Sequence, residues 1–201
     1  MGALYFVTGG ARSGKSRFAV RLAEAEARTG SPVVFVATME ALDDELRDRV
    51  ARHRAARPPA WRTVEAPLSP AAALAEAGAE ACVLLDCLSL WLSNLLLAAP
   101  GVEDISGDGA PSAAMGSDAR EGLEARIGAE VDILLRAIAH HRGPTIVVSN
   151  EVGSGIVPAG PLGRLFRDLL GSANQQVAAA ADRGWLLVAG RAVELPPADA
   201  F

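Results

Sequence analysis

Short apolar runs alternate along this chain with longer amphipathic stretches. The short runs are rich in β-branched and aromatic residues, so they predict strands buried on both faces. They span residues 4–7, 33–36, 82–85, 145–148 and 185–188. In the longer stretches apolar residues recur every three or four positions, which predicts helices. These stretches span residues 15–29, 42–56, 70–77, 88–98, 123–140 and 163–181.

Strands that alternate with helices predict an α/β fold, in which helices cover both faces of a mostly parallel sheet. A turn at Gly190 and Arg191, followed by residues 192–195, predicts an antiparallel strand at one edge. The length suits one domain with a large core, so we expect residues 1–201 to form a single domain. Residues 100–118, rich in Gly, Ser, Asp and Pro, interrupt the helical pattern and predict a flexible surface loop.

Composition narrows the class of protein. Half of the residues are hydrophobic, which excludes a disordered chain. The formal net charge of −5, from 19 basic and 24 acidic residues, argues against a general nucleic-acid partner. Two cysteines make neither a disulfide framework nor a zinc site. No segment has the pattern of a signal peptide or a membrane span, so we expect a cytoplasmic protein.

Directly after the first predicted strand, the chain matches the phosphate-loop pattern G-x-x-x-x-G-K-[ST]. The matching residues are Gly9, Gly10, Ala11, Arg12, Ser13, Gly14, Lys15 and Ser16. Glycines let backbone N–H groups turn inward around a polyphosphate, and the following helix adds its positive N-terminus. Lys15, the one lysine beside 18 arginines, would reach the β- and γ-phosphates. The alternative is a glycine-rich turn that arises by chance; the strand before the motif and the helix after it favour nucleotide binding.

A magnesium ion bound with the nucleotide would take oxygen ligands from the protein. The motif assigns the Ser16 hydroxyl as one such ligand. Asp86 directly follows the buried run at 82–85 and is the candidate for the second. An alternative role for Asp86 is the N-cap of the helix predicted to begin at Leu88, and both roles can coexist.

The stretch 42–56 carries acidic residues at its start and arginines toward its end, as the helix dipole favours. Leu46, Val50 and His53 are spaced by four and three, so they share one helix face. Neighbouring guanidinium groups disfavour imidazolium, which predicts a neutral His53 at neutral pH. A neutral ring nitrogen is a nucleophile, and the arginines would hold a triphosphate for it to attack. The alternative is a solvated surface histidine, the commoner role of a lone histidine on a charged helix.

Six segments together resemble the bifunctional adenosylcobinamide kinase / adenosylcobinamide-phosphate guanylyltransferase family. They are VTGGARSGKSR at 7–17, VFVAT at 34–38, LDDELRDRVARHRAARPPAWRTVEAP at 42–67, LLDCLSLWLSNLL at 84–96, VVSNEVGSGIVP at 147–158 and LGRLFRDLLGSANQQVAAAADRGWLLVAG at 162–190. The resemblance implies a P-loop, RecA-like domain and two reactions. In the first, ATP or GTP phosphorylates the hydroxyl of the aminopropanol arm of adenosylcobinamide. In the second, GTP donates GMP to the resulting phosphate, which gives adenosylcobinamide-GDP and pyrophosphate.

The resemblance also implies roles for individual residues. The guanylyl group would pass through a covalent intermediate on His53, with Lys15 as a second catalytic residue and Mg²⁺ as cofactor. The implied nucleotide contacts are the phosphate loop, Ala37, Thr38, Met39, Arg54, Ala55, Ala56, Arg57, Glu65 and Asp86. Family members often carry Glu at the position of Asp86. The aspartate side chain is shorter, so its carboxylate reaches less far toward a metal ion or a ribose. The family further implies a homotrimer.

Three residues in the matching segments keep two interpretations. Asn150, Glu151 and Asn174 have either a role in the site or a role as caps of helices and turns.

Three other protein classes share the phosphate loop. A monofunctional P-loop small-molecule kinase is the alternative function, and it predicts that His53 is dispensable. A regulatory GTPase recognises guanine through an N-K-x-D motif, which the chain lacks because Lys15 is its only lysine. A DNA motor of the same fold class would need a basic or aromatic-lined path for a strand, and the acidic chain argues against it.

Overall fold

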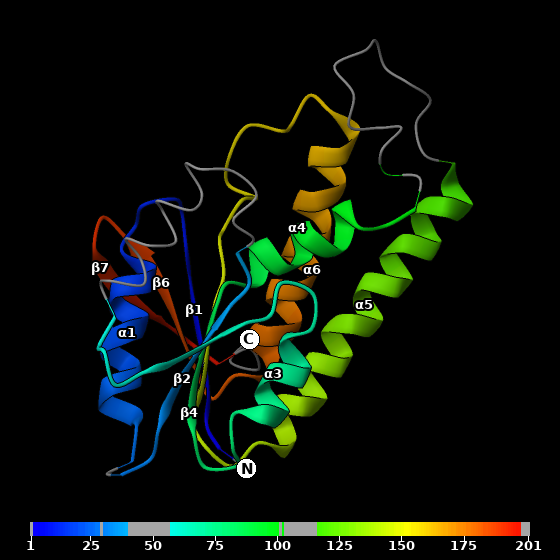
Figure 1. The fold of residues 1–201 in the computed structure, drawn as a ribbon. Helices are drawn as coiled ribbons and strands as arrows, with labels where there is room; N and C mark the ends of the chain where they lie inside the picture. The colour runs from blue at the N-terminus through cyan, green and yellow to red at the C-terminus, as the bar shows by residue number, and fades with distance from the viewer. Residues whose placement is uncertain (1, 29, 40–56, 101, 103–115, 198–201) are drawn as a thin grey trace.

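Seven strands form one sheet, in which β1 to β6 run parallel and β7 is antiparallel to β6 (Figure 1). The computed structural model describes residues 2–28, 30–39, 57–100, 102 and 116–197. The strands are β1 (Leu4–Gly9), β2 (Val33–Ala37), β3 (Arg62–Glu65), β4 (Cys82–Asp86), β5 (Thr145–Val148), β6 (Arg183–Val188) and β7 (Arg191–Leu195). Their order across the sheet is β3-β2-β4-β5-β1-β6-β7. This sheet, with an antiparallel strand at its edge, confirms the predicted α/β fold class.

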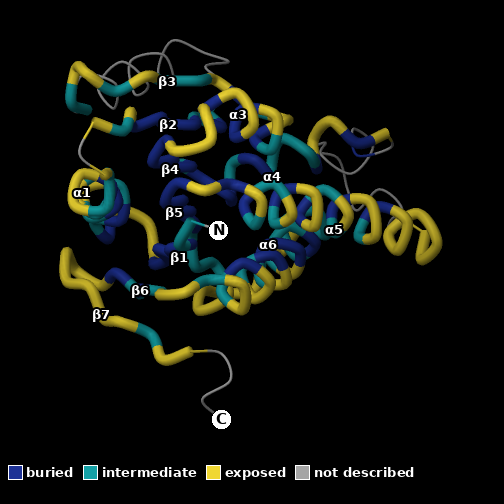
Figure 2. Tube along the Cα trace, turned by 90° about the horizontal axis from the view of Figure 1, so that it is seen from below, coloured by how far each residue is buried: buried dark blue, intermediate teal, exposed yellow. Residues whose placement is uncertain are grey.

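Helices cover both faces of the sheet (Figure 2). They are α1 (Lys15–Glu26), α3 (Pro70–Glu76), α4 (Leu88–Leu97), α5 (Ser117–His140) and α6 (Pro161–Ala180). Alternate residues of a strand point to opposite faces. Tyr5 and Val7 therefore pack with α1, whereas Leu4 and Phe6 pack with α3 to α6. Each face has its own core, which is why the central strands are apolar at most positions. Within the described residues, no helix has both the length and the apolar character that a membrane crossing requires.

The structure contains one strand that the hydrophobic pattern does not predict. β3 pairs in parallel with β2 at the edge of the sheet, with Val34 opposite Arg62 and Ala37 opposite Glu65. Every residue of β3 is half-buried or exposed. An edge strand needs no continuous apolar run, so the criterion that finds the central strands does not find this one.

The described residues of the predicted loop at 100–118 differ from the prediction. Val102 is buried in the core beneath α3 to α6, and α5 begins at Ser117 instead of residue 123. Residues 103–115 and the predicted helix at 42–56 lie outside the described residues.

The six parallel strands all end at one edge of the sheet, called here the carboxyl edge. The register places Glu65, Ala37, Asp86 and Val148 in one row across β3, β2, β4 and β5. Val7 of β1 lies opposite Val148, and β1 continues beyond it to Gly9. Parallel pairing thereby brings predicted site residues from distant parts of the sequence to the same edge.

Candidate functional site

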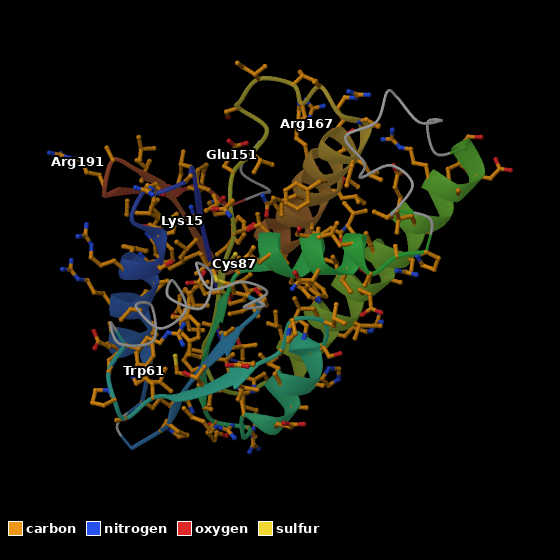
Figure 3. All side chains as sticks on the ribbon, turned by 45° about the horizontal axis from the view of Figure 1, so that its top comes forward. Lys15, Trp61, Cys87, Glu151, Arg167 and Arg191 are labelled. Atoms are coloured by element: carbon orange, nitrogen blue, oxygen red, sulfur yellow. The ribbon has the colours of Figure 1, made fainter. Side chains whose placement is uncertain are left out.

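The phosphate loop joins β1 to α1 at the carboxyl edge (Figure 3). Gly9 has φ +145°, and a Cβ at this position would lie 2.4 Å from the carbonyl oxygen of Leu187. Ser13 accepts a hydrogen bond of 2.9 Å at its carbonyl oxygen from the backbone N–H of Gly190, in the β6–β7 turn. The neighbouring strand and turn thus fix the path of the loop. Its outer residues Gly10, Ala11 and Arg12 are exposed, Ser13 and Lys15 are buried, and Gly14 and Ser16 are intermediate.

Lys15 lies at the start of α1 and turns its ammonium group back toward the loop. Its Nζ donates to the carbonyl oxygens of Gly9 at 2.8 Å and Gly10 at 2.6 Å. The residue is only 8% exposed, and this burial lowers the pKa of Lys15, while Cys87 and Asp86 act in the opposite direction. A triphosphate would give the buried ammonium group a stronger, anionic acceptor than these carbonyls.

Asp86 ends β4 and acts electrostatically on Lys15, so the predicted acid and the predicted lysine share one site. The alternative role of Asp86 as the N-cap of α4 is wrong. Cys87 occupies that position, because α4 begins at Leu88.

Thr38 joins the carboxyl ends of β2 and β4. Its hydroxyl donates to the Cys87 carbonyl oxygen and accepts from the Cys87 N–H, both at 2.8 Å. Asn94 of α4 donates its side-chain amide to the Thr38 carbonyl oxygen at 2.8 Å. Thr38 is fully buried, whereas its predicted neighbours in the nucleotide site, Ala37 and Met39, are half-buried. Thr38 thus fixes how β2 and β4 lie relative to each other at the site.

Cys87 is the thiol that the structure places beside Lys15 and Asp86 (Figure 3). Burial, followed by the Asp86 carboxylate, raises the pKa of Cys87 to about 11. Cys82 is buried on β4, and burial raises its pKa to about 12. Only a thiolate is a good nucleophile, so neither cysteine suits covalent group transfer.

We therefore expect both thiols to be unreactive in the folded protein. At pH 8, Ellman's reagent should release no colour within minutes from the native chain, and two equivalents per chain after unfolding in urea. Rapid reaction of one thiol in the native protein would contradict the burial and raised pKa values described above.

Two further predicted contacts, Arg57 and Glu65, lie at the β3 side of the sheet. The Arg57 guanidinium stacks on the Phe35 ring, 3.3 Å from its centroid, and its Nη1 donates to the Thr63 hydroxyl at 3.2 Å. Glu65 is exposed at the end of β3, and a pocket of about 270 Å³ opens beside it toward α3. His53, Arg54, Ala55 and Ala56 lie outside the described residues.

A hydrogen-bonded amide cluster links the carboxyl ends of β4 and β5 to α6. Asn174 of α6 accepts from the Ser149 hydroxyl at 2.5 Å and donates to the Asn150 carbonyl oxygen at 3.0 Å. The Asn150 side chain donates to the Ser89 hydroxyl at 2.6 Å. The next residue, Glu151, donates its backbone N–H to the Gly9 carbonyl oxygen at 3.0 Å. The cluster thus reaches the same carbonyl that accepts from Lys15.

These contacts show what Asn150, Glu151 and Asn174 bond to in the structure; a role of these residues in the site stays a prediction. The Glu151 carboxylate accepts from the N–H groups of Gly153 at 2.7 Å and Ser154 at 3.2 Å, so Glu151 caps a turn. Asn150 and Asn174 cap no helix: they connect the β5 end to α4 and α6. Sequence spacing does not indicate this cluster, because its members come from different elements.

Replacing Asn174 by Ala removes both of its hydrogen bonds and leaves the Ser149 hydroxyl without its acceptor. We expect a loss of about 1–3 kcal/mol in the free energy of unfolding. We also expect the KM for nucleoside triphosphate to rise, because the β5 end that contacts Gly9 loses its support. Urea unfolding and steady-state kinetics measure the two effects. Gln175→Ala, an exposed amide on the same helix, is the matched control; equal behaviour of the two variants would contradict the role of Asn174.

Comparisons with known proteins find a matching family and relatives of similar length. Residues 5–195 match the family model described as cobinamide kinase / cobinamide phosphate guanyltransferase. The chain is 42% identical over 185 residues to the bifunctional adenosylcobalamin biosynthesis protein CobP of Pseudomonas aeruginosa, covering 92% of each chain. It is 40% identical over 193 residues to the bifunctional adenosylcobalamin biosynthesis protein CobU of Escherichia coli, covering 96% of this chain and 99% of the relative.

Among solved structures, a KaiC-like protein of the archaeon Pyrococcus horikoshii matches 92% of this chain and 70% of its own, with a TM-score of 0.42 and 14% identity. The family match spans nearly the whole chain and includes the phosphate loop, Asp86 and the amide cluster. The chain belongs to the cobinamide kinase / cobinamide phosphate guanyltransferase family.

Proposed function

We propose that this protein phosphorylates adenosylcobinamide with ATP or GTP and then transfers GMP from GTP to the new phosphate. The products of the second step are adenosylcobinamide-GDP and pyrophosphate. The observation that carries the proposal is the buried Lys15 ammonium at the carboxyl edge, beside Asp86, in a chain that belongs to this family.

The kinase step needs positioning and charge neutralisation more than covalent chemistry. The loop N–H groups bind the phosphates, and Lys15 exchanges the Gly9 and Gly10 carbonyls for phosphate oxygens. The substrate hydroxyl oxygen then forms a bond to the γ-phosphorus as the bond to the β–γ bridging oxygen breaks, and the hydroxyl proton leaves to water or to a phosphate oxygen. Lys15 stabilises the charge that develops on the departing diphosphate.

The transfer step uses His53 as nucleophile. A neutral ring nitrogen of His53 forms a bond to the α-phosphorus of GTP, and the α–β bridging bond breaks to release pyrophosphate. An oxygen of adenosylcobinamide phosphate then attacks the same phosphorus, and the P–N bond breaks to restore the neutral ring. Two successive displacements thus replace a single direct attack of adenosylcobinamide phosphate, an anion, on GTP, a second anion. In this proposal Arg54, Ala55, Ala56, Arg57 and Glu65 belong to the guanine-nucleotide site, as the family resemblance implies.

The site suits Mg²⁺ that is bound together with the nucleotide. Among the described residues no cluster of three His, Cys, Asp or Glu side chains forms a metal cage. Ser16 and Asp86 offer hard oxygen donors, and Mg²⁺ typically takes one or two protein ligands plus substrate phosphates. When bound, the ion would neutralise phosphate charge; Ser16 and Asp86 are the residues that would hold it.

The family resemblance also supports a homotrimer located in the cytoplasm. Size-exclusion chromatography with light scattering tests the assembly directly. A mass of three chains is the expected result, and a monomer at micromolar concentration is the contrary one.

Product analysis tests the two-step function. With adenosylcobinamide and ATP alone, mass spectrometry should detect the corrinoid phosphate; addition of GTP should convert it to the GDP derivative with release of pyrophosphate. A monofunctional kinase would stop at the phosphate. Absence of the phosphate itself would overturn the proposed function.

A further inference from the structure

The segment between β5 and α6, residues 151–160, is held at both ends. At its start, Glu151 bonds to Gly9 through its N–H and caps the following turn through its carboxylate. Val152 packs against the core. At its end, Arg164 donates through Nη1 to the carbonyl oxygens of Pro158, at 3.0 Å, and Ala159. These contacts give the segment a defined path that leads away from the carboxyl edge and back to α6 (Figure 1).

The middle of this segment presents two β-branched apolar side chains to solvent. Ile156 is 98% exposed and Val157 is 59% exposed. A single exposed apolar residue is ordinary on a protein surface. Here two consecutive ones lie in the middle of an anchored segment, and their exposure means that they contribute little to the core. Their exposure therefore indicates that this surface contacts an apolar group of another molecule.

The position of the segment relates it to the reacting groups. It leaves the sheet at the end of β5, between β1, which carries the phosphate loop, and β4, which carries Asp86. Glu151 and Lys15 both donate to the Gly9 carbonyl oxygen, so the base of the segment adjoins the ammonium group (Figure 3). Ile156 and Val157 follow Glu151 in the same segment, so the base of the segment ties them to the carboxyl edge.

The substrate of the proposed function is large relative to the atoms that react. Its hydroxyl sits at the end of a short aminopropanol arm, and the arm is attached to a corrin ring with methyl groups and amide side chains. When the arm reaches a phosphorus held by Lys15, the ring must lie over the surface around the carboxyl edge. The methyl groups of this ring are stabilised by contact with exposed apolar side chains.

We propose that Ile156 and Val157 form an apolar contact for the corrin ring of adenosylcobinamide, an inference that rests on the proposed function. The contact selects the substrate: it orients the ring so that the arm enters the site beside Glu151. The nucleotide does not use it, because the phosphate loop and its neighbours bind the triphosphate.

The double variant I156S/V157S tests the contact without removing core packing. Equilibrium dialysis of adenosylcobinamide, followed by its visible absorbance, should show a dissociation constant at least about tenfold higher than in the parent. The KM for adenosylcobinamide should rise in parallel, while the KM for ATP and the kcat at saturation stay within about twofold. The conservative variant I156L/V157I should restore binding. Ile133→Ser, which replaces an isoleucine that is 42% exposed on α5, is the matched control and should bind as the parent does.

The outcomes separate this contact from the proposed function. If the parent phosphorylates adenosylcobinamide and I156S/V157S binds it equally well, the contact is wrong and the function stands. If light scattering shows that the double variant changes its number of subunits, the two side chains belong to an interface between copies, which also overturns the contact. A parent that neither binds nor phosphorylates adenosylcobinamide overturns both proposals.

Discussion

Replacing Lys15 by Ala is expected to abolish both reactions, with each kcat reduced by about 100-fold or more. One buried ammonium group at the phosphate loop serves the triphosphate in the kinase step and in guanylyl transfer, so neither step survives its loss. Lys15→Arg should fail as well, although it keeps the charge. A planar guanidinium does not fit where Nζ lies between the Gly9 and Gly10 carbonyl oxygens.

Steady-state kinetics of the two half-reactions, measured separately, check this prediction. Arg17→Ala removes an exposed cation from the same helix and is the matched control, with an expected change of less than about threefold. Thermal unfolding should show that the Lys15 variants remain folded, because the lysine contacts the loop and not the core. Retention of either reaction by Lys15→Ala within tenfold of the parent would contradict a shared phosphate site.

Replacing His53 by Ala is expected to separate the two activities. Guanylyl transfer should fall by about a thousandfold or more, because the variant lacks the atom that forms the P–N bond. Phosphorylation of adenosylcobinamide should persist within a few-fold, since that step uses no protein nucleophile. Mass spectrometry of the products, with ATP and GTP both present, should then find the corrinoid phosphate accumulating.

The control for this variant is His140→Ala. His140 is exposed near the end of α5, where its Nδ1 lies 2.7 Å from the Arg136 carbonyl oxygen, so its loss should leave both activities unchanged. If His53→Ala transfers GMP at the parental rate, the histidine is dispensable, and transfer proceeds by direct attack on GTP.

The central strands and the phosphate loop follow from local sequence, because both depend on neighbouring residues. A strand buried on both faces needs an unbroken apolar run, as in β1, β4 and β5. A phosphate loop needs glycines at fixed spacing, and Gly9 illustrates why: a side chain there would meet the Leu187 carbonyl. Asp86 is predictable for a similar reason, since a polar residue that ends a buried parallel strand must reach the carboxyl edge.

The edge strand and the amide cluster depend instead on distant parts of the chain. β3 is half-buried or exposed and gains its strand conformation by pairing with β2, so no local pattern distinguishes it from a loop. Asn150, Ser89 and Asn174 meet only because the end of β5, α4 and α6 lie together in the folded chain. The matching segments of the family contain these residues, but their hydrogen-bond partners are a property of the tertiary structure.

The most direct test of the account follows the α-phosphorus of GTP itself. The parent protein, incubated with Mg²⁺ and GTP labelled at the α-phosphate and then denatured, should retain a label that is acid-labile and alkali-stable, as a phosphoramidate is. Adenosylcobinamide phosphate should discharge that label into adenosylcobinamide-GDP, and His53→Ala should acquire none. A parent that forms adenosylcobinamide-GDP at full rate while retaining no label at any time would contradict the guanylyl-histidine intermediate.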